Sequence, residues 1–202
     1  EQYLKPKEQD EEYVAQVLYI MKNHPMIDQQ LLALERSVYI QSAEIDDEII
    51  DWLEKGVDIH PVVQFHALQS LRKRGVTGKI ELMRMGEQVE LEIEKTPLSM
   101  EDFPSAVTQI VERVESVTES DDPTLPHFAR ELWKQSIQFL YGTTSFEWMI
   151  NGDEEWVDCY AAALHVVLLL TVYGKADDDF IRDTYGITEP LRFRYEQACR
   201  TL

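Results

Sequence analysis

The stretch Asn23-His24-Pro25-Met26-Ile27 recurs in form 36 residues later as Ile59-His60-Pro61-Val62-Val63. In both copies a proline follows the end of one helical pattern and opens the next, because proline lacks an N–H donor but is tolerated in the first turn of a helix. Leu32 and Leu68 then fall at equivalent places. A helix-pair period in the thirties to forties is typical of stacked helical repeats, although coincidence within a helical chain would give the same pattern.

Helical periodicity surrounds both copies of this boundary. Apolar residues recur there at three- and four-residue steps. The four helices predicted in this way cover residues 8–23, 26–39, 46–55 and 61–74. Gly56 and Gly75 follow the third and fourth helix, as glycine commonly does at a helix C-terminus. The sequence therefore predicts two helix pairs as N-terminal repeats over residues 1–76.

The period then changes from helical to two. Three apolar residues alternate strictly with three glutamates, in the order Val89, Glu90, Leu91, Glu92, Ile93 and Glu94. A first apolar run with Ile80, Leu82 and Met85 meets this second run at Met85-Gly86-Glu87-Gln88. The pattern predicts a β-hairpin within residues 77–98, with one face on the helices and the glutamates toward solvent.

The second helical half is predicted over residues 99–202. Its expected helices cover residues 99–117, 126–141 and 154–173, a short segment at 180–184 and a last helix after Pro190. Ser99 is expected to open the first of them, and Trp133 to lie at the flank of the second. Tyr160 to Tyr173 is the longest apolar stretch, and it is too short to span a bilayer, so a buried central helix is expected.

Together these patterns predict a mainly α fold: stacked helix pairs of the HEAT-like or tetratricopeptide-like kind, with one β-hairpin between two helical halves. The domain boundaries follow as 1–76, 77–98 and 99–202, unless the chain forms one continuous domain.

The chain is strongly acidic, with 38 acidic against 19 basic side chains and a formal charge of -19. Such a field repels phosphate backbones and anionic membranes, so neither nucleic acid nor membrane is an expected partner. It favours a basic protein or peptide, or it simply keeps the protein soluble. Cys159 and Cys199 have no CxxC spacing and are expected to be free thiols, which predicts a cytoplasmic protein. Residues 1–12 are mostly charged and do not resemble a signal peptide.

Catalytic and metal-binding motifs are missing from the sequence. There is no HExxH pattern, nucleophile elbow or glycine-rich phosphate loop, so no catalytic residue, cofactor or metal is predicted. His24 and His60 precede prolines at helix starts, where an imidazole is expected to bind free backbone groups. His165, within the apolar helix, is expected to be a hydrogen-bonded core residue.

Six residues are candidates for a binding surface: Tyr13, Tyr39, Trp52, Arg72, Lys73 and Arg74. The three aromatic residues are equally compatible with burial in the core. The basic run, with Lys79, is either a site for an acidic peptide or a favourable partner for a helix C-terminus.

The segment from His60 to Leu98 resembles a group of uncharacterised Firmicutes proteins that join tetratricopeptide-like or HEAT-like helical repeats to a small β insertion. The residues that carry the resemblance are His60-Pro61-Val62-Val63, Leu68, Leu71, Lys73-Arg74-Gly75-Val76 and the hairpin ending near Pro97. The resemblance implies a cytosolic repeat protein that acts as a protein-binding scaffold. It supplies no catalytic residues.

The leading hypothesis is therefore a non-enzymatic protein–protein interaction scaffold of the helical-repeat type. The alternative is a small-ligand-binding protein or enzyme with a pocket between the helical halves, around Trp156, Tyr160 and His165. A self-associating module is a third reading, and the sequence leaves the oligomeric state open.

Overall fold

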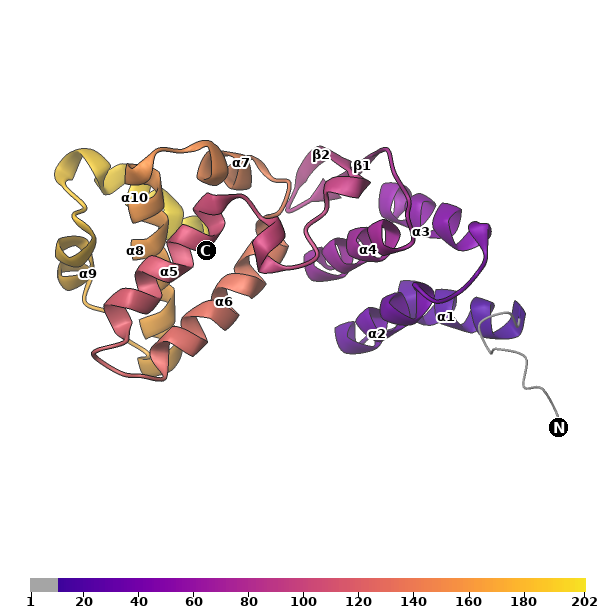
Figure 1. Ribbon diagram of the computed structural model, residues 1–202, viewed down its shortest axis with the longest axis horizontal. Helices are drawn as coiled ribbons and strands as arrows, with labels where there is room; N and C mark the ends of the chain where they lie inside the picture. Colours follow the sequence, from indigo (N-terminus) through magenta and orange to yellow (C-terminus); the bar gives the residue numbers. More distant parts are fainter. Residues whose placement is uncertain (1–10) are drawn as a thin grey trace. The chain divides into compact units, whose positions relative to one another are not determined.

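The helical periodicity of the sequence is realised almost throughout the computed structural model, which describes residues 11–202 (Figure 1). This part of the chain contains ten α-helices and one two-stranded antiparallel sheet, so the predicted mainly α fold with a β-hairpin is confirmed. The chain divides into two compact units between Leu98 and Ser99. We call residues 11–98 unit 1 and residues 99–202 unit 2.

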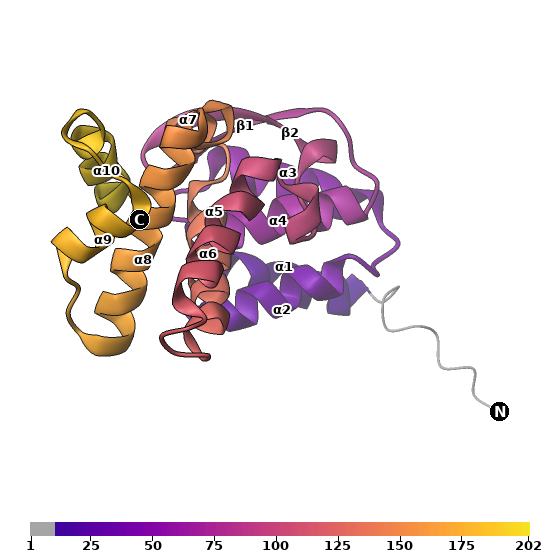
Figure 2. The same cartoon turned by 60° about the vertical axis from the view of Figure 1, so that its left-hand side comes forward.

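Unit 1 begins with two helix pairs. Its helices are α1 (Glu11–Asn23), α2 (Ile27–Ser37), α3 (Ala43–Lys55) and α4 (Pro61–Lys73). Helix α1 packs on α2, α3 packs on α4, and the two pairs meet mainly through α2 and α4. Figures 1 and 2 show α1 and α2 as one layer and α3 and α4 as the next. This stacking of consecutive helix pairs is compatible with a helical-repeat fold.

The two His-Pro boundaries are built alike. The backbone N–H of Met26 donates to Nδ1 of His24 over 3.0 Å, and the N–H of Val62 donates to Nδ1 of His60 over 3.2 Å. Each imidazole thus satisfies an N–H that the helix start leaves unpaired, as predicted. The equivalence ends there, because Leu32 is 37% exposed and Leu68 is fully buried.

Close contact between α2 and α4 rests on small polar side chains. Ser37 and Ser70 both donate their hydroxyl protons to the carbonyl oxygen of Leu34, over 2.6 Å and 3.1 Å. Both serines are buried. A serine at these positions lets the two backbones approach while its hydroxyl group still finds a partner.

Arg74 joins α4 to the segment between α2 and α3. Its side chain is only 7% exposed and forms an ion pair with Asp46. The guanidinium also donates to the carbonyl oxygens of Ser37 and Ile40, both at 2.5 Å, and of Ser42 at 2.9 Å. Helix α3 begins at Ala43, three residues before the predicted start at Asp46. Asp46 consequently lies in the first turn of α3, where an acidic side chain is favourable.

The predicted hairpin is present as β1 (Lys79–Arg84) and β2 (Glu87–Glu92), which pair with Lys79 opposite Glu92. Met85 and Gly86 form the two-residue turn with φ of 48° and 80°, as the twist of a tight hairpin requires. The strand ends earlier than predicted. Ile93 to Lys95 form the 3-10 turn η2, so the alternation does not continue as strand through Glu94.

One face of the hairpin packs on the helices. Ile80, Leu82 and Val89 are buried, and Arg84 is also completely buried. The Arg84 guanidinium donates to the carbonyl oxygen of Pro61 at 2.9 Å. A buried cation is retained only where such acceptors surround it, so Arg84 fixes the hairpin to the start of α4.

Unit 2 is arranged around its most apolar helix. Its elements are the 3-10 turn η3 (Met100–Asp102), α5 (Ser105–Thr118), α6 (Leu125–Leu140), α7 (Thr144–Asn151), α8 (Glu154–Tyr173), α9 (Asp178–Tyr185) and α10 (Glu189–Thr201). All five other helices of the unit contact α8. Figure 2 shows α5 and α6 on one side of α8 and α9 and α10 on the other. The predicted central helix is thus covered mainly between Val157 and Leu168, whereas Leu170, Val172 and Tyr173 near its C-terminus are exposed.

Two predictions in unit 2 are wrong. The helix expected to open at Ser99 begins at Ser105, because Pro104 disfavours the helical conformation at the preceding residue. Phe103 is accordingly extended, with ψ of 155°, and Ser99 leads only into the short turn η3. Trp133 does not lie at the flank of α6. It is fully buried, and its indole N–H donates to the carbonyl oxygen of Val107 at 2.8 Å.

Helix α8 is, among the described residues, the one helix with the length and apolar composition to cross a membrane. Half of its most apolar stretch is buried by other parts of the protein. Its C-terminal end is more exposed, and the hydroxyl group of Tyr173 donates there to Asp122 over 2.8 Å.

His165 occupies the core of unit 2, where it is 2% exposed. Its Nδ1 lies 2.9 Å from the hydroxyl oxygen of Tyr185 on α9. Burial lowers the pKa of the imidazole below its ordinary value, and the carboxylate of Asp121 opposes that shift. His165 is therefore the hydrogen-bonded core histidine that the sequence predicts.

We expect Arg74→Met to lower the free energy of unfolding of unit 1 by about 3 kcal/mol, because it removes the buried ion pair with Asp46 and three hydrogen bonds to main-chain carbonyls. Native-state hydrogen exchange of the α2 to α4 amides measures the change. The matched control is Lys73→Met at the exposed neighbouring position, which should alter stability by less than about 0.5 kcal/mol. Equal effects of the two substitutions would contradict the role given to Arg74.

We expect unit 2 to lose stability as the pH falls below 6.5, the ordinary pKa of histidine. The unfolded chain then takes up a proton at His165, whereas the folded unit, with its lowered pKa, stays neutral. Stability is fully present above this pH and decreases toward the folded-state pKa. Urea unfolding at several pH values measures the slope, and His165→Gln should make it shallower. An unchanged slope in that variant would contradict the assignment.

Candidate functional site

The predicted surface aromatics lie on separate elements of unit 1. Tyr13 is half-buried on α1 and Trp52 is half-buried on α3. Tyr39 follows α2 and is 70% exposed. Of the three, only Tyr39 offers most of its ring to a partner.

The basic run is divided between the interior and the surface. Arg74 is held inside unit 1 as described, and the Arg72 guanidinium donates to the carbonyl oxygen of Thr96 over 2.5 Å. Lys73 is exposed. Two of the three cations thus bind main-chain carbonyls of their own unit.

A hollow of about 740 Å³ lies between α1 and the start of α3. We call it the α1–α3 groove, and its lining residues are Glu11, Val14, Ala15, Leu18, Gln41, Ser42, Ala43 and Glu44. Val14 and Leu18 are four residues apart on α1, on a stripe beside the fully buried Val17 and Met21, and are half-buried. Their side chains give the groove an apolar part, while carboxylates lie at both Glu11 and Glu44.

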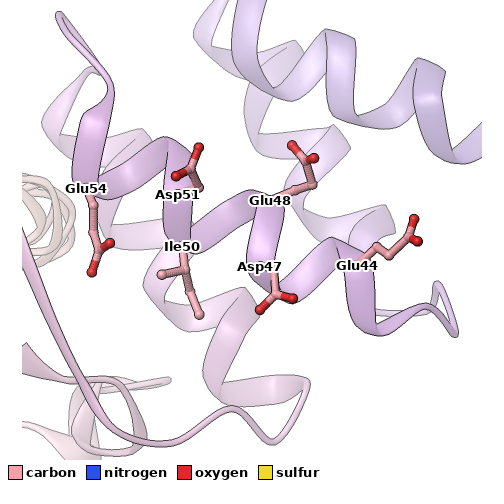
Figure 3. A pocket seen from close by; sticks show the side chains of 6 residues that line it. All are labelled: Glu44, Asp47, Glu48, Ile50, Asp51 and Glu54. Carbon is pink, nitrogen blue, oxygen red and sulfur yellow. The ribbon is translucent and has the colours of Figure 1, made fainter.

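A second hollow, of about 490 Å³, lies along α3. Its lining defines the acidic face of α3: Glu44, Asp47, Glu48, Ile50, Asp51 and Glu54. Figure 3 shows Glu48 and Asp51 projecting to one side of the helix and Asp47, Ile50 and Glu54 to the other. The opposite face of α3 carries the buried residues Ile45, Ile49 and Leu53. The helical period therefore places five carboxylates on one solvent-exposed surface.

Few cations neutralise this surface. Lys22 on α1 contacts Glu48 at 2.6 Å, and Lys55 forms an ion pair with Asp51. No ion pair joins Glu44, Asp47 or Glu54 to a cation among the described residues. Because Glu44 lines both hollows, the groove and the acidic face form one continuous surface with a net negative charge.

The residues of the alternative pocket do not all lie together in unit 2. The rings of Trp156 and Tyr160 are 6.0 Å apart, and Tyr160 is buried with its hydroxyl group 3.4 Å from the carbonyl oxygen of Ser145. His165 pairs instead with Tyr185. Trp156 lines a surface hollow of about 320 Å³ with Trp148. The structure thus places His165 in the core and Trp156 at the surface.

Metal binding and thiol chemistry can be assessed over residues 11–202 from side-chain clusters and from the burial of Cys159. No cluster of three or more His, Cys, Asp and Glu side chains there has the arrangement to hold a metal ion. Burial raises the pKa of the Cys159 thiol to about 11, so this thiol is protonated at neutral pH and is a poor nucleophile.

The sequence motifs do not include the acidic face, although the spacing of its carboxylates is present in the sequence. Glu44, Asp47, Glu48, Asp51 and Glu54 follow the helical spacing. The groove had no such signal, because it depends on how α1 packs beside α3.

Comparison with known proteins adds no relative to this description. No protein-family model, no curated protein and no solved structure matches the chain.

Proposed function

We propose that the protein is a non-enzymatic interaction scaffold of the helical-repeat type, which binds a basic partner protein on the α1–α3 groove and the acidic face of α3. The observation that carries the proposal is the continuity of these two hollows through Glu44. In stacked helix pairs, equivalent helices form an extended surface that suits a peptide or protein ligand.

The two parts of this surface supply different contributions to binding. Val14 and Leu18 offer apolar contact area, which supports affinity when a partner covers it. Glu44, Asp47 and Glu54 form no ion pair among the described residues, so basic side chains of a partner can pair with them without breaking an internal ion pair. Such charge complementarity speeds association and selects the partner.

Arg74 contributes by holding the surface in shape. It donates to the carbonyl oxygen of Ser42, which lines the groove, and pairs with Asp46 in the first turn of α3. A preformed groove loses less conformational entropy on binding than a mobile one. In this proposal Arg74, one of the three residues of the basic run, holds the start of α3 in place and so positions the acidic surface.

A scaffold of this kind agrees with the expected cytoplasmic location, free thiols and resemblance to Firmicutes helical-repeat proteins. Cys159 and Cys199 are both free. The partner's basic character follows from the chemistry of α3 and from the formal charge of -19.

Charge reversal on α3 tests the proposal. We expect the triple variant Glu44→Lys, Asp47→Lys and Glu54→Lys to lose at least about ten-fold in affinity for basic partners, because attraction becomes repulsion at the contact. Fluorescence anisotropy with an amphipathic helical peptide of leucine and lysine measures the affinity, and a leucine–glutamate peptide reports non-specific apolar binding.

The matched control reverses three exposed acidic residues of unit 2: Glu112→Lys, Glu119→Lys and Asp183→Lys. It changes the net charge by the same amount but leaves the proposed site intact. It should therefore weaken binding of the basic peptide much less, and mainly at low salt. Equal loss in both triple variants would assign binding to overall charge and overturn the proposed site. Failure of the wild-type protein to bind the basic peptide would overturn it as well.

A further inference from the structure

The outer edge of β2 is a second surface of unit 1 with unsatisfied hydrogen-bonding capacity. The N–H of Ile93 donates to the carbonyl oxygen of Gly78 at 2.9 Å, just beyond the Lys79–Glu92 pair. In an antiparallel ladder hydrogen-bonded pairs alternate with pairs that are not hydrogen-bonded. Lys79, Glu81 and Met83 of β1 therefore direct their backbone groups outward, as do Gln88 and Glu90 of β2.

The outer edges of β1 and β2 differ in whether other parts of the protein bond to their backbone groups. On β1, the carbonyl oxygen of Met83 accepts a hydrogen bond from the Gln64 side chain at 2.7 Å, and α3 packs against this strand. On β2, no described residue bonds to the backbone N–H or carbonyl groups of Gln88 and Glu90. Both residues are exposed. An open edge of this kind is a template for another strand.

The side chains along this edge indicate what it would accept. On the solvent face Glu81 lies directly opposite Glu90, and like charges in that position are destabilising. Lys79 contacts Glu90 at 2.9 Å and Lys95 forms an ion pair with Glu92. Glu81 forms no ion pair among the described residues, so the three carboxylates on this face meet only two lysines. On the other face Val89 is buried and Leu91 is half-buried. A strand added beside β2 would place alternate side chains next to these carboxylates and next to this apolar surface.

We propose that the outer edge of β2 binds an extended segment of a partner protein in which basic and apolar residues alternate. The segment adds a third strand through the backbone groups of Gln88 and Glu90. Its basic side chains offset the repulsion between Glu81 and Glu90, and its apolar side chains continue the face formed by Val89 and Leu91. This binding is independent of the α1–α3 groove.

The test uses the whole chain and the heptapeptide Lys-Val-Lys-Val-Lys-Val-Lys with blocked ends. We expect the amide NMR signals of Gln88 and Glu90 to shift, and their hydrogen exchange to slow at least about ten-fold at saturation. The Glu-Val peptide of the same length should not bind. Glu90→Lys should weaken binding of the basic peptide at least about ten-fold, with its folding checked by the remaining amide signals.

Two N-methylated forms of the basic peptide separate strand pairing from charge attraction. Methylating the lysine amides or the valine amides leaves the charge unchanged but removes alternate donors, so one form should bind and the other should not. Equal binding by both forms would overturn the proposal. So would absence of binding, or shifts confined to Glu44 and Asp47 on α3. Shifts confined to α3 would support the proposed groove function while overturning the β2 site. Shifts at Gln88 and Glu90 that persist in the α3 triple variant would show that β2 binds the peptide without the acidic face of α3.

Discussion

An α-helix leaves backbone N–H groups unpaired at its start and carbonyl groups unpaired at its end, and the packing of this protein depends on how side chains satisfy them. His24 and His60 accept from N–H groups at the two His-Pro boundaries of unit 1. Arg74 supplies donors to the carbonyls after α2. In unit 2, Asp153 and Asp177 accept from the first turns of α8 and α9. Bonds of this kind close the junctions before α2, α4, α8 and α9.

Hydrogen bonding of arginine side chains to main-chain carbonyls also explains why the surface of unit 1 keeps an excess of negative charge. Arg72, Arg74 and Arg84 all donate to main-chain carbonyls, so three of its cations are engaged internally. On α3 lysines pair only with Glu48 and Asp51 among the described residues, and on the solvent face of the hairpin Glu81 forms no ion pair beside the lysine-paired Glu90 and Glu92. Two acidic surfaces result, one helical with an apolar groove and one with an open strand edge. These are the two surfaces that we propose to bind basic partners, the first through a helix face with its groove and the second through an added strand.

Much of the fold follows from local sequence patterns, and the predictions that are wrong have identifiable physical causes. Helix α8 was predicted with its observed bounds because capping, apolar length and the following Gly174 agree. The helix expected from Ser99 was misplaced because the restriction imposed by Pro104 outweighs a good capping sequence. Trp133 was misjudged because the contact that buries it comes from Val107, a residue 26 positions earlier. The helical spacing of the acidic residues is sufficient to predict the acidic face of α3, whereas no sequence pattern predicts the groove beside it.

The sequence by itself determined the helical class, the His-Pro boundaries, the presence of a hairpin and the excess of negative charge, because these depend on periodicity, turn chemistry and composition over short distances. Only the tertiary structure decided that Arg74 turns inward and that an open groove and an open strand edge remain. Those features depend on contacts between residues far apart in the chain. Local periodicity gives the face that a helix buries, but it does not specify which neighbour covers that face or where the cover ends.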